Sequence, residues 1–311
     1  MTFHSMMRRR RGAAWLAVAI LALTPAHAHA CACGCGVFEI GTPAMFPTGT
    51  GGMFSLEYDF MNQNANWSET SAAPAEDNED QQIRTSFVTA GAQYLFNRTW
   101  GVTAELPYWD RLFRTTEGGE NATFTHAALG DVRIQGLFTG VSPDLSTGLS
   151  AGLKLPTGDY KYENFDRDTQ IGTGSTDLLL GGYHAGALTA SRAWTWFVDG
   201  EWDQPFAYSG DYHPGSDVNA TVAVSYTAYR PAGIGIAPML GVLGSVRARD
   251  SGAEADPDNS GYNRVLLTPG LDVRAAGLRA TLVVNVPVYQ HVNGNQLVAP
   301  ALVKVALGHG F

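Results

Sequence analysis

From residue 50 onward, about twelve strand-like segments are joined alternately by connections of a few residues and by polar loops that are mostly much longer. Each segment is rich in β-forming residues, and most are bounded by turn residues. Alternation of two connection lengths is hard to obtain in a soluble sandwich and is typical of a closed barrel that stands in a membrane. We therefore predict an all-β fold, a single antiparallel transmembrane β-barrel of about twelve strands with short periplasmic turns and long extracellular loops.

The boundaries of these segments follow from the turn residues between them. The predicted strands cover residues 52–62, 84–96, 101–113, 127–140, 146–155, 174–188, 193–206, 216–229, 233–250, 261–273, 278–291 and 297–311. The short connections are 97–100, 141–145, 189–192, 230–232 and 274–277, and the longer ones are 63–83, 114–126, 156–173, 207–215 and 251–260, with a tighter final loop at 292–296. An even number of strands puts both termini on the short-turn side.

The amino terminus has the pattern of a secretory signal peptide. A basic run at 8–11 precedes an apolar stretch at 13–23 and a small-x-small cleavage site at 28–30. No later segment reaches the roughly 18 uninterrupted apolar residues that a membrane helix needs, so insertion into a membrane would be by strands. We expect residues 1–30 to be the signal peptide, 31–51 a periplasmic segment that contains cysteines, and 52–311 the barrel.

The charge balance of the chain excludes one class of partner. After removal of residues 1–30 the chain would keep 16 basic residues against 29 acidic ones, a net charge of −13. Nucleic acid is not expected to bind so acidic a protein. The expected partners are outer-membrane lipid and lipopolysaccharide, the barrel-assembly machinery, and a small-molecule or ion cargo.

Alternation of side chains along the strands separates the two faces of the predicted wall. In residues 278–289, one face carries Leu278, Ala280, Leu282, Val284, Val286 and Val288, and the other carries Arg279, Thr281, Asn285 and Tyr289. The same parity places on the lumen face the acids Glu57, Asp59, Glu105, Asp131, Asp177, Asp199, Glu201, Asp203 and Asp272, and the bases Arg133, Lys154, Arg247, Arg249, Arg264 and Lys304. A base on the lipid face would cost about 2–4 kcal/mol at the midplane, so these charges need a paired or aqueous environment.

Two interpretations of this polar lumen remain open. The charges are either structural pairs that fill a narrow barrel, or the lining of a selective pore. Asp199, Glu201 and Asp203 share one face of one strand and would repel one another, so we expect a basic neighbour, a cation or water beside them.

Aromatic residues gather where the predicted strands end. Near the short turns lie Tyr94, Phe96, Trp100, Trp194 and Trp196, and near the long loops lie Tyr108, Trp109, Phe113, Trp202 and Phe206. Such a distribution favours interfacial girdles. The final strand ends on Phe311, as outer-membrane barrels commonly do.

Two motifs carry a family resemblance. Residues 154–158 read KLPTG and residues 172–177 read GTGSTD. Together they resemble the paired signature of a family of outer-membrane transporters named for the meta-cleavage pathway of phenol degradation, and the CACGCG run at 31–36 resembles a related group of barrels with a cysteine-rich amino terminus. The resemblance implies a barrel and transport. It does not imply a phenolic substrate.

The three cysteines of the chain, Cys31, Cys33 and Cys35, follow the predicted cleavage site at alternate positions. In an extended chain they share one face, where thiolates could hold a soft ion such as Cu(I) or Zn(II). Oxidation of two of them to a disulfide and lipidation of Cys31 are the alternatives.

The acidic loop runs at 76–80, 166–168 and 256–259 offer oxygen ligands that could bind Ca²⁺, although solvated turn chemistry explains them as well. His213 and Ser216 lie close together in the chain, as an esterase or phospholipase of the outer membrane would require, but without the His-x-Ser spacing. We therefore expect a protein that is not an enzyme but a channel or transporter for small solutes or ions, with a possible link to a metal. The alternative is a structural or metal-binding outer-membrane protein with a plugged lumen.

Overall fold

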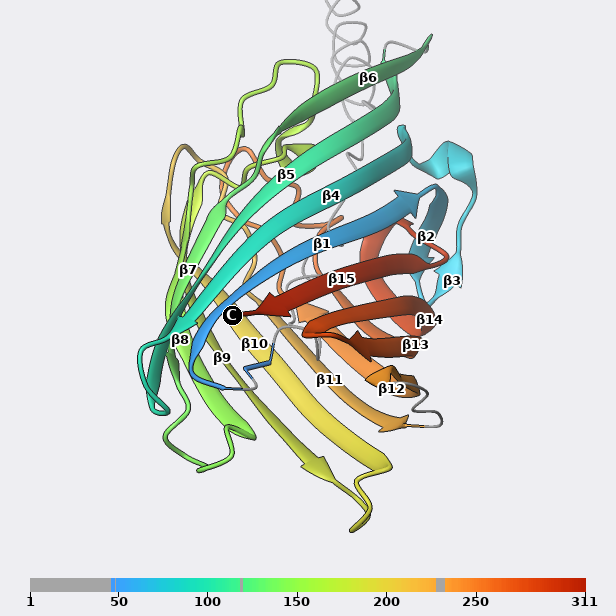
Figure 1. Cartoon of the computed structure of the whole chain (residues 1–311). Helices are drawn as coiled ribbons and strands as arrows, with labels where there is room; N and C mark the ends of the chain where they lie inside the picture. Colours follow the sequence, from blue (N-terminus) through green and yellow to red (C-terminus); the bar gives the residue numbers. More distant parts are fainter. Residues whose placement is uncertain (1–45, 48, 118–119, 228–232) are drawn as a thin grey trace, which may run out of the picture.

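The computed structural model describes residues 46–47, 49–117, 120–227 and 233–311. Their strands form one antiparallel sheet that closes on itself as a barrel (Figure 1). The wall runs, in order, through β1 (Gly51–Gln63), β4 (Asp80–Leu95), β5 (Trp100–Glu117), β7 (Val132–Phe138) with β6 (Glu120–Leu129), β8 (Thr147–Leu155), β9 (Ser175–Ala187), β10 (Trp194–Tyr208), β11 (Asp217–Tyr226), β12 (Gly235–Arg247), β13 (Tyr262–Ala275), β14 (Leu278–Val298) and β15 (Leu302–Gly310).

Pairing of the first and last strands closes the barrel. β1 pairs with β15 from Met53 opposite Gly310 to Met61 opposite Leu302. With β6 and β7 counted as one interrupted strand, the wall has twelve strands, which confirms the predicted fold class. Among the described residues, no helix has the length and apolar character needed to cross a membrane.

The tight turns are built from local conformations that the residues specify. Between β13 and β14 only two residues intervene, Ala276 with φ 49° and Gly277 with φ 80°. Two successive positive φ values define the type I′ turn, whose twist matches that of the flanking strands. The hairpin therefore has a fixed register, with Ala275 opposite Leu278.

The outer face of the barrel is apolar and its inner face is polar. On β1, Phe54, Leu56 and Tyr58 are exposed, whereas Glu57 and Asp59 between them are buried. Equivalent exposed apolar residues on the other strands include Leu106, Ile134, Leu149, Leu180, Val198, Val222, Leu240 and Leu282. A soluble protein has the opposite distribution, whereas lipid favours an apolar surface and leaves charges to the interior.

Three connections and one strand differ from the predicted ones, and in the three connections backbone pairing continues beyond the apolar band. Residues 114–126, predicted as a loop, extend β5 and β6 as a hairpin, with Thr116 opposite Asn121. The predicted strand 127–140 is interrupted between Leu129 and Val132. The loop 63–83 contains β2 (Ala65–Glu69) and β3 (Ser71–Ala72), and β2 supplies a partner to β14 through the predicted loop 292–296. The last turn is therefore 299–301.

Three aromatic side chains do not lie where the sequence placed them, Trp109 and Phe113 by their position near a strand end and Tyr289 by alternation. Phe113 is buried inside the barrel, and Trp109 packs inward against Phe87 with ring centroids 4.7 Å apart. Both belong to the inner face of β5, so they are not girdle residues. Tyr289 is exposed on the outer face because the pairing of β13 with β14 shifts at Val265, which interrupts the alternation.

Candidate functional site

The buried charged residues gather inside the barrel wall. Eleven predicted lumen residues are buried, namely Glu57, Asp59, Asp131, Arg133, Lys154, Asp177, Asp199, Asp203, Arg264, Asp272 and Lys304. Glu105, Glu201 and Arg247 are half-buried on the same face. Arg249 differs, because its side chain is 50% exposed and meets Asp258 in the loop after β12, so it lies outside the lumen.

Arg133 of β7 lies among three carboxylates on two other strands. Its guanidinium forms an ion pair with Glu201 of β10 and lies 3.7 Å from Glu105 of β5 and 3.8 Å from Asp203 of β10. Gln135 donates a second hydrogen bond to Glu201 at 2.7 Å. Arg133 is therefore the basic neighbour that the acidic run on β10 requires.

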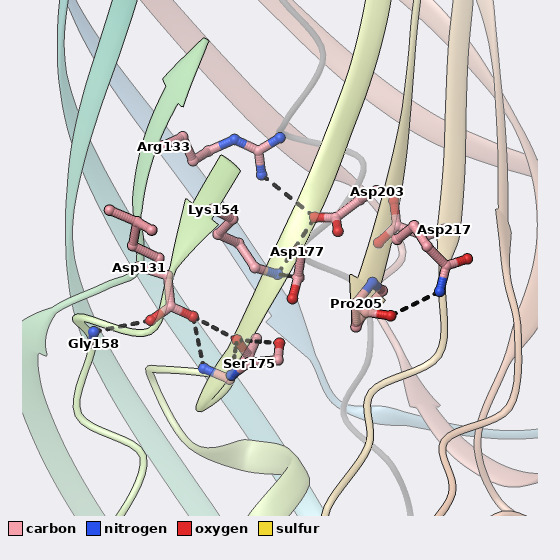
Figure 2. A network of polar contacts seen from close by, with 12 residues as sticks. Asp131, Arg133, Lys154, Gly158, Ser175, Asp177, Asp203, Pro205 and Asp217 are labelled. Carbon is pink, nitrogen blue, oxygen red and sulfur yellow. Dashed lines mark hydrogen bonds and ion pairs between the residues drawn. The ribbon is translucent and has the colours of Figure 1, made fainter. Parts of the chain in front are cut away.

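Lys154 of β8 is the second basic residue beside that acidic run. Its ammonium forms an ion pair with Asp177 of β9 and lies 3.4 Å from Asp203 (Figure 2). These residues come from three adjacent strands, and pairing of Lys154 opposite Asp177 in the β8–β9 register brings them together.

A third basic residue of the interior forms an ion pair on strands β1 and β15. Lys304 of β15 meets Glu57 of β1 at 2.7 Å. Asp59 is two residues further along β1, is 3% exposed, and has its Oδ1 buried without a hydrogen-bond partner in the described part of the chain.

Asp199 is the one member of the β10 acidic run that neither Arg133 nor Lys154 contacts in the described residues. Its side chain is buried, and its Oδ2 has no hydrogen-bond partner there. Arg133 and Lys154 therefore relieve the repulsion within the run directly at Glu201 and Asp203.

Two small cavities adjoin these charges. One, of about 80 Å³, is lined by Glu57, Asp59, Glu105, Asp131, Arg133 and Lys154 among others. The other, of about 100 Å³, is lined by Gln93, Glu105, Gln135, Asp199 and Glu201 among others. Glu105 lines both cavities, so they adjoin each other inside the barrel.

We call the charged residues of these two cavities and their ion-pair partners the central charge cluster. It contains the carboxylates Glu57, Asp59, Glu105, Asp131, Asp177, Asp199, Glu201 and Asp203, and the bases Arg133, Lys154 and Lys304. The eight carboxylates exceed the three bases by five formal charges.

Asp131 has a different role from the other carboxylates, because groups of the loop 156–174 donate hydrogen bonds to both of its carboxylate oxygens. Its Oδ1 accepts a hydrogen bond from Gly158 N at 2.9 Å, and its Oδ2 accepts bonds from Thr173 N at 2.8 Å and Thr173 Oγ1 at 2.6 Å (Figure 2). It lies at the interruption between β6 and β7, where the chain leaves the ladder. Asp131 thus holds together the two motifs KLPTG and GTGSTD.

The loop 156–174 folds into the barrel instead of projecting from it. Phe165 and Ile171 are buried, and Phe165 packs against Phe113 with ring centroids 5.7 Å apart. Ile171 also lines the cavity of about 80 Å³. This loop therefore covers the long-loop side of the central charge cluster.

Arg111 of β5 holds the same loop from the barrel wall. It is 1% exposed and donates hydrogen bonds to the carbonyls of Thr169 and Gln170, the latter at 3.1 Å, and to Thr85 Oγ1 at 2.9 Å. Sequence reasoning missed Arg111 as a lumen residue. The signal was present, because Arg111 has the same parity on β5 as Glu105.

Arg247 and Asp250 stabilise the long loops that follow β10 and β12. Asp250 accepts hydrogen bonds from Tyr212 Oη at 2.8 Å, Gly215 N at 2.7 Å and Arg247 Nη2 at 3.0 Å. Burial raises the pKa of Tyr212 well above its usual value, so its hydroxyl keeps the proton that it donates. The role of this group is structural.

The acidic loop runs do not form an obvious metal site. No group of three or more His, Cys, Asp or Glu side chains in the described residues could hold a metal ion. Asp80 lies at the outer end of β4, beyond the exposed Arg84 that marks the limit of the apolar band. Burial, with the nearby charges of Asp168 and Asp166, raises the pKa of Asp80 to about 9.

Phe46 lies inside the short-turn end of the barrel. Its ring stacks on Tyr183 at 4.6 Å and meets Phe197 edge-on at 5.5 Å. Phe46 also lines the cavity of about 100 Å³ and a larger one, of about 740 Å³, that reaches Asp272 and Phe311. Cys31, Cys33 and Cys35 lie outside the described residues.

Comparison with solved structures identifies the fold. The chain is similar to an outer-membrane channel of Pseudomonas putida F1, with a TM-score of 0.65, 10% sequence identity, and coverage of 87% of this chain and 100% of that one. It is also similar to the β domain of the Bordetella autotransporter BrkA, with a TM-score of 0.52, 11% identity, and coverage of 84% and 100%. The protein therefore has the fold of an outer-membrane β-barrel.

The sequence matches no family model and no curated protein sequence at a significant level. The resemblance to the meta-pathway transporter family is therefore not confirmed beyond the barrel fold.

Proposed function

We propose that the protein is a channel for small solutes or ions in the outer membrane of a Gram-negative bacterium. The observation that carries the proposal is the pair of adjoining cavities, each lined by charged residues, inside a closed barrel whose outer face is apolar. Polar groups at that position have no role in contacting lipid, and water or a hydrated solute can replace the contacts that they lack. The short turns and both termini face the periplasm, and the long loops face outward.

Conductance of the full chain in planar bilayers tests this proposal, with uptake of sugars and amino acids of increasing size into vesicles as a second measurement. A step-like current that heat-denatured protein does not produce is the expected result. A folded barrel that neither conducts nor admits any solute would refute the channel function.

The competing function is that of a structural or metal-binding outer-membrane protein with a plugged lumen, and two features of the structure favour it. Loop 156–174 lies inside the barrel, and Met61, Phe87, Leu243 and Leu266 form an apolar cluster in the interior. Folded protein that stays closed to ions, even when the loop is released by Asp131→Ala, would establish this alternative.

A metal link rests on Cys31, Cys33 and Cys35, whose alternate spacing suits a soft ion such as Cu(I) or Zn(II). We expect one equivalent of metal to bind the reduced protein and to be lost when all three residues become serine, while the barrel stays folded. An acyl mass on Cys31 in the mature protein would exclude a site made of three free thiols.

A further inference from the structure

The central charge cluster contains more carboxylates than bases. Its eight carboxylates are matched by only three bases in the described residues, and Asp131 alone among the carboxylates is satisfied by loop backbone. A lumen lined by an excess of one sign attracts ions of the opposite sign and repels those of the same sign. Small anions therefore meet an unfavourable potential at this depth.

Asp199 is a buried carboxylate of the cluster that forms no ion pair with Arg133 or Lys154 in the described residues. Its carboxylate is buried, its Oδ2 lacks a hydrogen-bond partner in the described residues, and it lines the cavity of about 100 Å³. A buried carboxylate oxygen without a hydrogen-bond partner is costly, and an entering cation would relieve that cost. Glu201 on the same face is already engaged by Arg133.

The other groups around this cavity suit a hard cation. Gln93, Thr103, Gln135 and Ser150 contribute amide and hydroxyl groups, whose oxygens are ligands for hard cations. No trio of His, Cys, Asp or Glu with metal-binding geometry occurs in the part of the chain that the structure describes. Such a cavity would hold a cation weakly, as passage through a pore requires.

We propose that the lumen passes small inorganic cations in preference to anions, and that Asp199 is the side chain that receives the cation in the cavity of about 100 Å³. The proposal rests on the channel function and names the class of ion that the channel favours. Arg133 opposes this preference, because its guanidinium lies between Glu105, Glu201 and Asp203 at the boundary of the two cavities.

Reversal potentials in planar bilayers test the proposal. The full chain, purified from outer membranes, is placed in a tenfold KCl gradient, and the permeability ratio of K⁺ to Cl⁻ is obtained from the potential at zero current. We expect a ratio of at least threefold for the wild type and a reduction of at least twofold in Asp199→Asn. Asp258→Asn removes a carboxylate that is 96% exposed in a loop, so it should leave the ratio unchanged.

A second variant covers the case in which Asp199→Asn does not fold. Ser150→Asp adds a carboxylate to the same cavity and should raise the ratio. A wild-type protein that conducts with a ratio of one or less would overturn the cation preference and leave the channel function intact. A ratio above one that neither variant changes would overturn the role of Asp199, and absence of any current would refute both proposals.

Discussion

Removal of the Asp131 carboxylate is expected to release the loop 156–174 from the interior of the barrel. In Asp131→Ala the loop loses three hydrogen bonds to one charged group, those from Gly158 N, Thr173 N and Thr173 Oγ1. Hydrogen bonds to charged groups contribute about 1.5–3 kcal/mol each. Hydrogen bonds to water replace part of this energy, so we expect the free energy of local opening to fall by about 3 kcal/mol. That change corresponds to an increase of about a hundredfold in the population of the open loop.

Trypsin cleavage after Arg167 measures that population. The Arg167 side chain is only 16% exposed, so we expect cutting there to require local opening. When opening and closing are faster than cleavage, the cleavage rate follows the open fraction. The assay uses a Lys161→Gln background, because exposed Lys161 offers a competing site.

The expected result is cleavage about a hundredfold faster in Asp131→Ala, with Asp258→Ala cut at the wild-type rate. The folded barrel must remain intact in all variants, as shown by its faster migration before heating in a detergent gel. Equal cleavage rates in folded Asp131→Ala and the wild type would refute the reasoning, since the loop would then be held without the carboxylate.

Three other predictions concern the same regions. Gly172→Ala should lower the midpoint of thermal unfolding, because the new Cβ would lie 2.4 Å from the backbone C of Gly158. The control Gly244→Ala should leave the midpoint unchanged, because its Cβ would meet nothing within 4 Å. Equal midpoints for the two variants would contradict the close contact between the two ends of the loop. Because the pKa of Asp80 is raised to about 9 in the folded protein, the fold favours its protonated form, so the stability that Asp80 contributes is fully present below about pH 4 and is lost as pH rises toward 9. Asp80→Asn should therefore make thermal stability fall less between pH 5 and pH 9 than it does in the wild type, and an equal fall in both proteins would contradict this contribution. Phe46→Ala should increase single-channel conductance, because the Phe46 ring lines two cavities. Packing against Tyr183 and Phe197, at about 0.5–1.5 kcal/mol for each aromatic pair, holds the ring in this position. Unaltered conductance would show that the ring does not narrow the path.

The division of the wall into two faces could be predicted because it is a local property of strands. Glu57 and Asp59 alternate with Phe54, Leu56 and Tyr58, and any extended chain sends such neighbours to opposite sides. The same reasoning misplaced Tyr289, because a shift in strand pairing depends on the partner strand and leaves no mark in the alternation. Arg249 was misplaced because alternation gives no sign of where a strand ends.

The sequence predicted most of the residues of the central charge cluster but not which of them pair with one another. The acidic run on β10 required a basic neighbour, yet nothing near Glu201 and Asp203 in the chain indicates that Arg133, about 70 residues away, supplies it. That contact depends on the closure of the barrel, which brings β7 and β10 to face one interior. The motifs around Gly158 and Gly172 were visible as a pair, but their common partner Asp131 was not.

The sequence by itself determined that this chain folds as a closed membrane barrel with charge inside, because side-chain alternation and connection length act over a few residues. Only the tertiary structure decided that loop 156–174 lies within the barrel and that, in the described residues, Arg133 and Lys154 pair with Glu201 and Asp203 but not with Asp199. Those outcomes depend on which side chains meet across the lumen, and contacts between residues so far apart in the chain are set by strand order, register and the space left inside the closed wall.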